Sequence, residues 1–248
     1  MTADFPPPLA AEIRDEDAVA LFQQLQQRVV QIPFESGAEI QTTYVHAAPE
    51  CSVSRAALIV LLAGFDSSLL EFRRLFSRLA TQHETWAIDL LGFGFTQAIP
   101  LTPVNPISIR HHLLKIVQTW IDQPVILVGA SLGGAVAIDF ALHHLGWVRL
   151  LVLIDSVGFS GSFPIGQFLP RSLLELGADW LRFRKSAALS AALTLPMMNS
   201  GLVDALRCSL LQQAMPGWKE ALVSFSQSGG YADLGNRISQ IQHQTLII

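Results

Sequence analysis

Four short apolar runs alternate with helix-like segments through the middle of the chain, and this rhythm constrains the fold more than any other feature. The runs cover Ala56–Leu62, Thr85–Leu91, Pro124–Gly129 and Arg149–Asp155. Apolar residues at helical spacing fill the segments between them, at Leu69–Leu79, Ser108–Ile121 and Leu132–His144. Continuous apolar strands of this length are typical of parallel sheets that are covered on both faces. The alternation therefore predicts an α/β fold with a mostly parallel, doubly wound sheet.

The alternation of strand-like and helix-like segments ends on either side of this region. Residues 156–237 contain helical pieces separated by prolines and by Gly229-Gly230, and a strand reappears only at Thr245–Ile248. Residues 1–31 are rich in proline and glutamine, which predicts a peripheral extension with a polar helix reaching Arg28, and two short strands are expected around Gly37 from Ile32. We therefore expect an N-terminal extension (1–31), a core (32–155), a helical insertion (156–237) and a return to the core (238–248). The last strand would then be a raw sheet edge, and we expect a functional domain to continue past it.

Composition and charge exclude several classes of function. The chain has 16 Lys and Arg against 20 Asp and Glu, a net charge of −4, which gives no support to a nucleic-acid partner. Its two cysteines, Cys51 and Cys208, lie far apart, and no metal-ligand cluster, P-loop or dinucleotide motif is present, so neither a cofactor nor a metal is expected. Without a secretory signal or an apolar run of about 20 residues, we expect a cytoplasmic protein with no integral membrane segment. The sequence does not indicate an oligomeric state.

The segment Gly129–Gly134 contains the sequence pattern that indicates a catalytic nucleophile. Its letters, GASLGG, contain G-x-S-x-G centred on Ser131, between an expected strand and an expected helix. A nucleophile elbow needs this setting, because the serine sits on a sharp strand-to-helix turn that tolerates only small neighbours. Ser131 is therefore the candidate nucleophile. The alternative is a glycine-rich turn in which the serine only caps the helix.

The loop AGFDSS, after the first buried strand, is the candidate second half of the site. The oxyanion that forms during acyl transfer needs two donors: the amide after the nucleophile and an amide in the earlier strand-to-helix loop. Here these are the amides of Leu132 and Phe65. In the alternative interpretation, Gly64 makes a turn while Asp66 or Ser67 caps the helix that follows. Both interpretations can hold together.

Four segments in this order and spacing resemble the core of the α/β-hydrolase superfamily. They are LLAGFDSSLLEFRRL, AIDLLGFGFT, ILVGASLGGAVAIDFAL and LLVLIDSVGF. The resemblance runs from about Ala56 to Ile248 and is greatest to the branch of small esterases, carbon–carbon bond hydrolases and cofactor-independent haloperoxidase-like enzymes. It implies that residues 156–237 form a lid, that Ser131 is the nucleophile and that Phe65 and Leu132 form the oxyanion hole. Where the family usually has His-Gly, this chain has Ala63-Gly64.

The resemblance also implies a triad acid and a histidine, and the chain offers no convincing candidate for either. His83, His143, His144 and His243 are expected at the end of the sheet opposite Ser131. His111 and His112 begin a helix that approaches the site, but a solvated helix face explains them better. Asp155 ends a strand where some lipase-like members place their acid, although a structural role is more common. We therefore expect the triad acid and the histidine beyond Ile248.

The remaining side chains refine the expected site. Asp89 is expected to order the GFGFT loop, and Phe65, Phe93 and Phe95 either wall a pocket or pack in the core. Apolar residues of the insertion suggest a cavity by composition: Phe163, Phe168, Leu169, Trp180, Met197 and Met198. The leading hypothesis is a serine-dependent hydrolase that forms an acyl-enzyme from a small, mostly apolar ester or acyl substrate. The alternatives are a catalytically silent binding protein that lacks the base, and a carbon–carbon bond hydrolase or haloperoxidase-like enzyme.

Overall fold

A mostly parallel sheet organises the computed structural model, which describes residues 8–32, 38–49, 57–96, 102–158, 166–194, 200–232 and 234–248. The described residues form a 7-stranded sheet in the order β1-β2-β4-β3-β5-β6-β7. The strands are β1 (Gln26–Ile32), β2 (Ala38–Ala47), β3 (Leu58–Leu62), β4 (Glu84–Ile88), β5 (Val125–Ala130), β6 (Val148–Ile154) and β7 (Thr245–Ile247). β2 pairs antiparallel with both β1 and β4, and every other pair is parallel. The predicted mostly parallel α/β sheet is confirmed.

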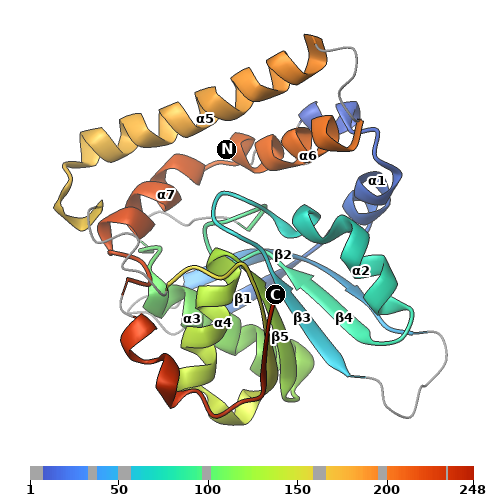
Figure 1. Ribbon diagram of the computed structural model, residues 1–248, viewed down its shortest axis with the longest axis vertical. Helices are drawn as coiled ribbons and strands as arrows, with labels where there is room; N and C mark the ends of the chain where they lie inside the picture. The colour runs from blue at the N-terminus through green and yellow to red at the C-terminus, as the bar shows by residue number, and fades with distance from the viewer. Residues whose placement is uncertain are drawn as a thin grey trace.

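Helices cover both faces of this sheet. Those outside the insertion are α1 (Glu16–Gln23), α2 (Arg73–Ala80), α3 (Pro106–Ile116) and α4 (Leu132–His143). Val60 and Leu62 of β3 join a core cluster with α3 and α4, whereas the alternating residues Ile59 and Leu61 join a second cluster with α1 and α2. Successive side chains of a strand point to opposite faces, so an apolar run such as β3 serves two cores at once. Apolar strands of this kind allow helices to pack on both faces of the sheet, as Figure 1 shows.

The helical insertion lies between β6 and β7 in the chain and stands over one end of the sheet (Figure 1). It contains α5 (Arg171–Thr194), α6 (Ser200–Leu211), the short 3-10 helix η6 (Gln212–Ala214) and α7 (Trp218–Gln227). α5 is the outermost of these helices and packs on α6 and α7.

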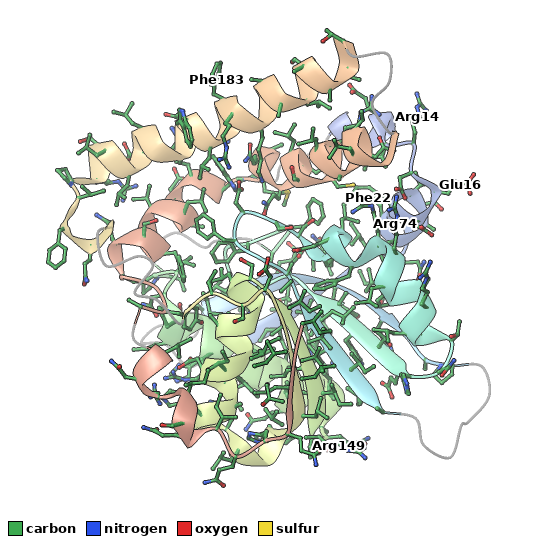
Figure 2. The ribbon with its side chains drawn as sticks, viewed as in Figure 1. Arg14, Glu16, Phe22, Arg74, Arg149 and Phe183 are labelled. Atoms are coloured by element: carbon green, nitrogen blue, oxygen red, sulfur yellow. The ribbon has the colours of Figure 1, made fainter. Side chains whose placement is uncertain are left out.

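Two side chains that were expected to line an apolar cavity are exposed on α5 or just before it. Trp180 is 57% exposed and Phe168, just before the helix, is 80% exposed, so these side chains lie on the surface and do not line a cavity. Phe183 points away from the rest of the molecule (Figure 2). The cavity prediction was wrong for Phe168 and Trp180, because composition alone does not say which face of a helix is covered. Phe163, Met197 and Met198 lie outside the described residues.

The first strand is the main difference from the sequence-based expectation. β1 begins at Gln26, inside the range assigned to an N-terminal extension, and α1 ends at Gln23, so the predicted helix reaching Arg28 was wrong there. β1 is an end strand, and its first four residues are exposed. A half-exposed edge strand carries no continuous apolar run, which is why the polar letters QQR did not indicate it. At the other end of the sheet, β7 is an end strand with exposed residues, as expected.

Candidate active site

Ser131 occupies a sharp turn between β5 and α4. Its backbone has φ 50° and ψ −111°, a combination that non-glycine residues adopt only at a cost. The turn is fixed by backbone hydrogen bonds: the Ser131 amide donates to the Ile154 carbonyl at 2.9 Å, and the Val157 amide donates to the Ser131 carbonyl at 3.2 Å. The strained strand-to-helix turn predicted from GASLGG is therefore present, and Ile154 of β6 and Val157, just after that strand, hold it in place.

Two glycines let α4 approach the sheet at this turn. A Cβ on Gly129 would lie 2.3 Å from the Gly133 carbonyl oxygen, and a Cβ on Gly133 would lie 2.0 Å from the Leu62 carbonyl oxygen. Both contacts are with backbone, which cannot rotate away as a side chain can. The first turn of α4 consequently packs directly on β3 and β5, and this close packing sets the position of Ser131.

The loop after β3 passes beside Ser131, as the sequence predicted. A Cβ on Gly64 would lie 3.3 Å from the Cβ of Ser131, and Phe65 follows directly. Leu132 is the first residue of α4, so its amide has no acceptor within the helix. The structure thus brings together the loop that contains Phe65, the start of α4 and Ser131.

The helix that follows this loop is not capped by Asp66 or Ser67. The Leu69 amide, at the start of the 3-10 helix η2 (Leu69–Phe72), donates to Asp89 Oδ1 at 2.7 Å. Asp66 is buried and turns to the insertion, where it meets side chains from α5, η6 and α7. The capping interpretation was wrong, because the carboxylate that serves as the cap comes from the end of a neighbouring strand.

Asp89 also orders the GFGFT loop, which confirms that prediction. Its Oδ2 accepts from the Phe95 amide at 2.8 Å, and its carbonyl accepts from Thr96 Oγ1 at 2.9 Å. Burial raises the pKa of Asp89 to about 7, because desolvation penalises the charged form more than these hydrogen bonds favour it.

An aromatic cluster links this loop to the insertion. The Phe65 ring lies 5.7 Å from that of Phe93 and 6.0 Å from that of Phe225 on α7, measured between centroids. Phe95 is fully buried in the other core cluster, near Phe22, so it packs in the core rather than walling a pocket. An open pocket of about 400 Å³ lies elsewhere, among α5, α6 and η6, and none of the predicted site residues lines it.

Four of the seven histidines have hydrogen-bond or ion-pair partners away from Ser131. His83 accepts from the Ala57 amide, His46 contacts Glu84, His143 contacts Asp139, and His243 contacts the Leu145 carbonyl. Glu84 begins β4 and Ala57 precedes β3, so His46 and His83 lie at the opposite end of the sheet, as does His243 before β7. In the described part of the chain, no hydrogen bond joins Ser131 Oγ to a histidine.

His112 corrects one expectation. It was expected on a solvated helix face, but it is fully buried, with Nε2 2.6 Å from Thr42 Oγ1. Burial lowers the pKa of His112 to about 3, so the ring is neutral in the core. The helical spacing of α3 cannot distinguish a buried histidine with one partner from an exposed one.

Asp155 pairs with no histidine among the described residues. It is exposed, has φ 48°, and its amide donates to the Ile248 carbonyl at 3.0 Å, which extends the pairing of β6 with β7.

Within the described ranges, no three His, Cys, Asp or Glu side chains gather as a metal site requires. No helix in those ranges has the length and apolar character needed to cross a bilayer.

Comparisons with known proteins agree on one family. A family model described as "Alpha/beta hydrolase family" matches residues 59–248. The chain is 39% identical over 194 residues to the alpha/beta hydrolase domain-containing protein VTE7 of Arabidopsis thaliana, covering 77% of this chain and 58% of that protein. It is 28% identical over 185 residues to the 2-hydroxymuconate semialdehyde hydrolase of Pseudomonas sp. (strain CF600), covering 71% of this chain and 62% of that enzyme.

A solved structure agrees on the fold. An esterase from Thermogutta terrifontis superposes with a TM-score of 0.68 at 18% identity, covering 90% of this chain and 79% of that one. At this identity the likeness concerns the fold alone. The chain spans less than two thirds of the length of both curated relatives named above.

Proposed function

Because the chain belongs to the alpha/beta hydrolase family, we propose that it is a serine-dependent hydrolase of a small, mostly apolar ester or related acyl substrate. The observation that carries the proposal is the backbone of Ser131, with φ 50° on a turn between β5 and α4. A serine held in a costly conformation by packed glycines and by β6 is the arrangement that a nucleophile elbow requires.

Ser131 Oγ attacks the carbonyl carbon of the substrate and forms a new C–O bond. The carbonyl oxygen becomes an oxyanion, which accepts hydrogen bonds from the amides of Leu132 and Phe65. A histidine takes the serine proton and gives it to the leaving alcohol, and water then hydrolyses the acyl-enzyme by the reverse roles. No described histidine hydrogen-bonds to Ser131 Oγ, so this proposal assigns neither the base nor its acid to a described residue.

The helical insertion acts in this proposal as a lid that shapes the substrate site. Its α7 brings Phe225 to Phe65, and the Phe93 ring lies 5.6 Å from that of Phe225. Phe93 and Phe225 are buried, so the partly exposed Phe65 ring is the apolar surface that this loop offers. It favours a substrate with an apolar acyl or alcohol part.

A fluorophosphonate probe tests whether Ser131 is the nucleophile. The probe labels the parent protein and the Ser156→Ala variant, because Ser156 lies beside the turn but donates its hydroxyl to the Val157 carbonyl. The Ser131→Ala variant is expected to lose the label. Labelling that persists in Ser131→Ala would refute the assignment.

Two other functions have specific support. Among the described residues Ser131 has no histidine partner, which favours a silent binding protein. Turnover of p-nitrophenyl esters by the 248-residue chain, abolished by Ser131→Ala, would exclude that function. The similarity to a 2-hydroxymuconate semialdehyde hydrolase favours cleavage of a carbon–carbon bond. Product analysis with an ester and with that semialdehyde, supplied separately, distinguishes the two chemistries.

A further inference from the structure

Asp66 is a buried carboxylate in the loop that contains the candidate oxyanion donor. Only 4% of the residue is exposed, and its backbone has φ 51°. The two carboxylate oxygens share four donors, all from the helical insertion. The donors are Gln212 Nε2 (3.0 Å) and Trp218 Nε1 (2.8 Å) on Oδ1, and Gln213 Nε2 (3.0 Å) and Lys185 Nζ (2.8 Å) on Oδ2.

This arrangement depends on the insertion being in place. A carboxylate is costly to bury unless its lone pairs are satisfied and a cation compensates its charge, and the donors here supply both conditions. They come from α5, η6 and α7, between 119 and 152 residues further along the chain. The loop itself supplies none of them, so the buried position of Asp66 and the seating of the insertion form one interdependent arrangement.

Hydrogen bonds hold the residues on both sides of Phe65, Gly64 and Asp66. On one side, the Gly64 amide donates to Glu71 Oε2 at 2.9 Å. On the other side, Lys185 Nζ donates to the Asp66 carbonyl at 2.7 Å, in addition to its contact with the carboxylate. The positive φ of Asp66 is a strained conformation that persists only where surrounding contacts maintain it. Contacts with the insertion are therefore what hold the far side of the loop.

We propose that Asp66 is a positioning residue that couples the helical insertion to the oxyanion hole: the amide of Phe65 is aimed at the reacting oxygen only when Lys185, Gln212, Gln213 and Trp218 hold Asp66. The proposal rests on the proposed function, because it needs Phe65 to be an oxyanion donor. It adds that the insertion, beyond covering the substrate, assembles one of the two donors. Opening of the insertion would then disable the chemistry as well as expose the site.

The kinetic test compares two buried carboxylates of the same protein. Asp66→Asn keeps the size of the side chain but removes an acceptor and the charge that Lys185 compensates. An oxyanion donor acts in the transition state, so kcat for a p-nitrophenyl ester is expected to fall about tenfold or more while KM changes less than about twofold. The matched control is Asp204→Asn.

Asp204 suits this control because it anchors the same insertion elsewhere. It is 1% exposed, accepts from the Arg14 amide at 2.7 Å and from Arg207 at 2.8 Å, and has no hydrogen bond to the AGFDSS loop. Its variant is expected to lose thermal stability but to keep kcat within about twofold. Equal losses of kcat in Asp66→Asn and Asp204→Asn would overturn the proposal, because general loosening of the insertion would then explain both.

A double variant tests whether the coupling passes through the ion pair. Lys185→Met and Asp66→Asn each break the same contact, so their combination is expected to lower kcat no further than the worse single change. If the two losses multiply, the residues act independently and the proposed coupling is wrong.

Hydrogen exchange separates this proposal from the function on which it rests. If Ser131 of the parent protein neither reacts with a fluorophosphonate nor supports ester hydrolysis, the proposed function fails. The coupling is then measured as amide exchange of a peptide covering residues 63–70 in the 248-residue chain. Exchange at least about tenfold faster in Asp66→Asn than in Asp204→Asn supports a loop held by the insertion, and equal protection refutes it.

Discussion

Adding one methyl group to Gly133 tests whether the candidate nucleophile depends on backbone packing. In the Gly133→Ala variant, the new Cβ would lie 2.0 Å from the carbonyl oxygen of Leu62 and 2.6 Å from its carbonyl carbon. Leu62 is in β3, hydrogen-bonded between β4 and β5, so it cannot move without disturbing the centre of the sheet. The helix that begins at Leu132 must move instead.

The expected size follows from this geometry. Reaching even a 3.0 Å contact requires a displacement of about 1 Å, and overpacking of a tight interior costs about 1–3 kcal/mol, with the upper end expected against backbone. Alanine returns up to about 1 kcal/mol through its better helix propensity. A net loss of about 2 kcal/mol corresponds to a fall in Tm of about 4–8 °C for a chain of this length.

Urea and thermal unfolding measure this loss against a matched control. Gly146 lies in the 3-10 helix Leu145–Trp147, and a Cβ there would meet nothing within 4 Å. Gly146→Ala is therefore expected to be neutral or slightly stabilising. The packing argument is refuted if the unfolding free energies of Gly133→Ala and Gly146→Ala differ by less than about 0.5 kcal/mol.

Three further predictions concern buried charge and are checked by unfolding midpoints, the first two between pH 3 and pH 8. Burial raises the pKa of Asp89 to about 7 from 3.8, so the folded state keeps a proton that the unfolded chain releases. The stability of the parent minus that of Asp89→Asn should therefore fall as pH rises from about 4 to 7, and a difference that does not change with pH would contradict this. Burial lowers the pKa of His112 from 6.5 to about 3, so the unfolded chain takes up a proton that the folded state does not. The stability of the parent minus that of His112→Gln should therefore fall as pH drops from about 6.5 to 3, and a difference that does not change with pH would exclude the group. Arg110→Met should cost about 1–3 kcal/mol, because buried Asp139 loses the cation 2.9 Å away and keeps only His143 at 3.2 Å and Arg237 at 3.9 Å. Exposed Arg149→Met should cost under about 0.5 kcal/mol, and similar costs for the two variants would show that the Arg110–Asp139 pair contributes nothing.

The apolar runs predicted the interior of the sheet well, because each strand there is covered on both faces. β3, β5 and β6 lie within two residues of their expected starts. β4 ends at Ile88, earlier than the expected Leu91, since Asp89 leaves the strand to hold two amides of neighbouring loops. No local pattern indicates that departure.

The elements that face solvent were harder to predict. Two strands were predicted around Gly37, but the first was placed from Ile32, whereas β1 runs from Gln26 to Ile32. An end strand needs no apolar alternation on its open side, and residues Gln26–Val29 are exposed. The expected helix Ser108–Ile121 is an α-helix to Ile116 followed by a π-helical turn, Val117–Ile121. Both forms bury similar side chains, so apolar spacing alone does not separate them.

The turn at Ser131 could be read from six consecutive letters, because the conformation of a strand-to-helix turn depends on which neighbours lack a Cβ. The role of Asp66 could not, since its four partners are more than a hundred residues away and meet it only after the insertion has packed. The neutral state of His112 likewise depends on the folded core, because burial of the ring lowers its pKa. Local steric constraints can be predicted from neighbouring residues in the sequence, whereas the environment of a buried polar group exists only in the folded chain.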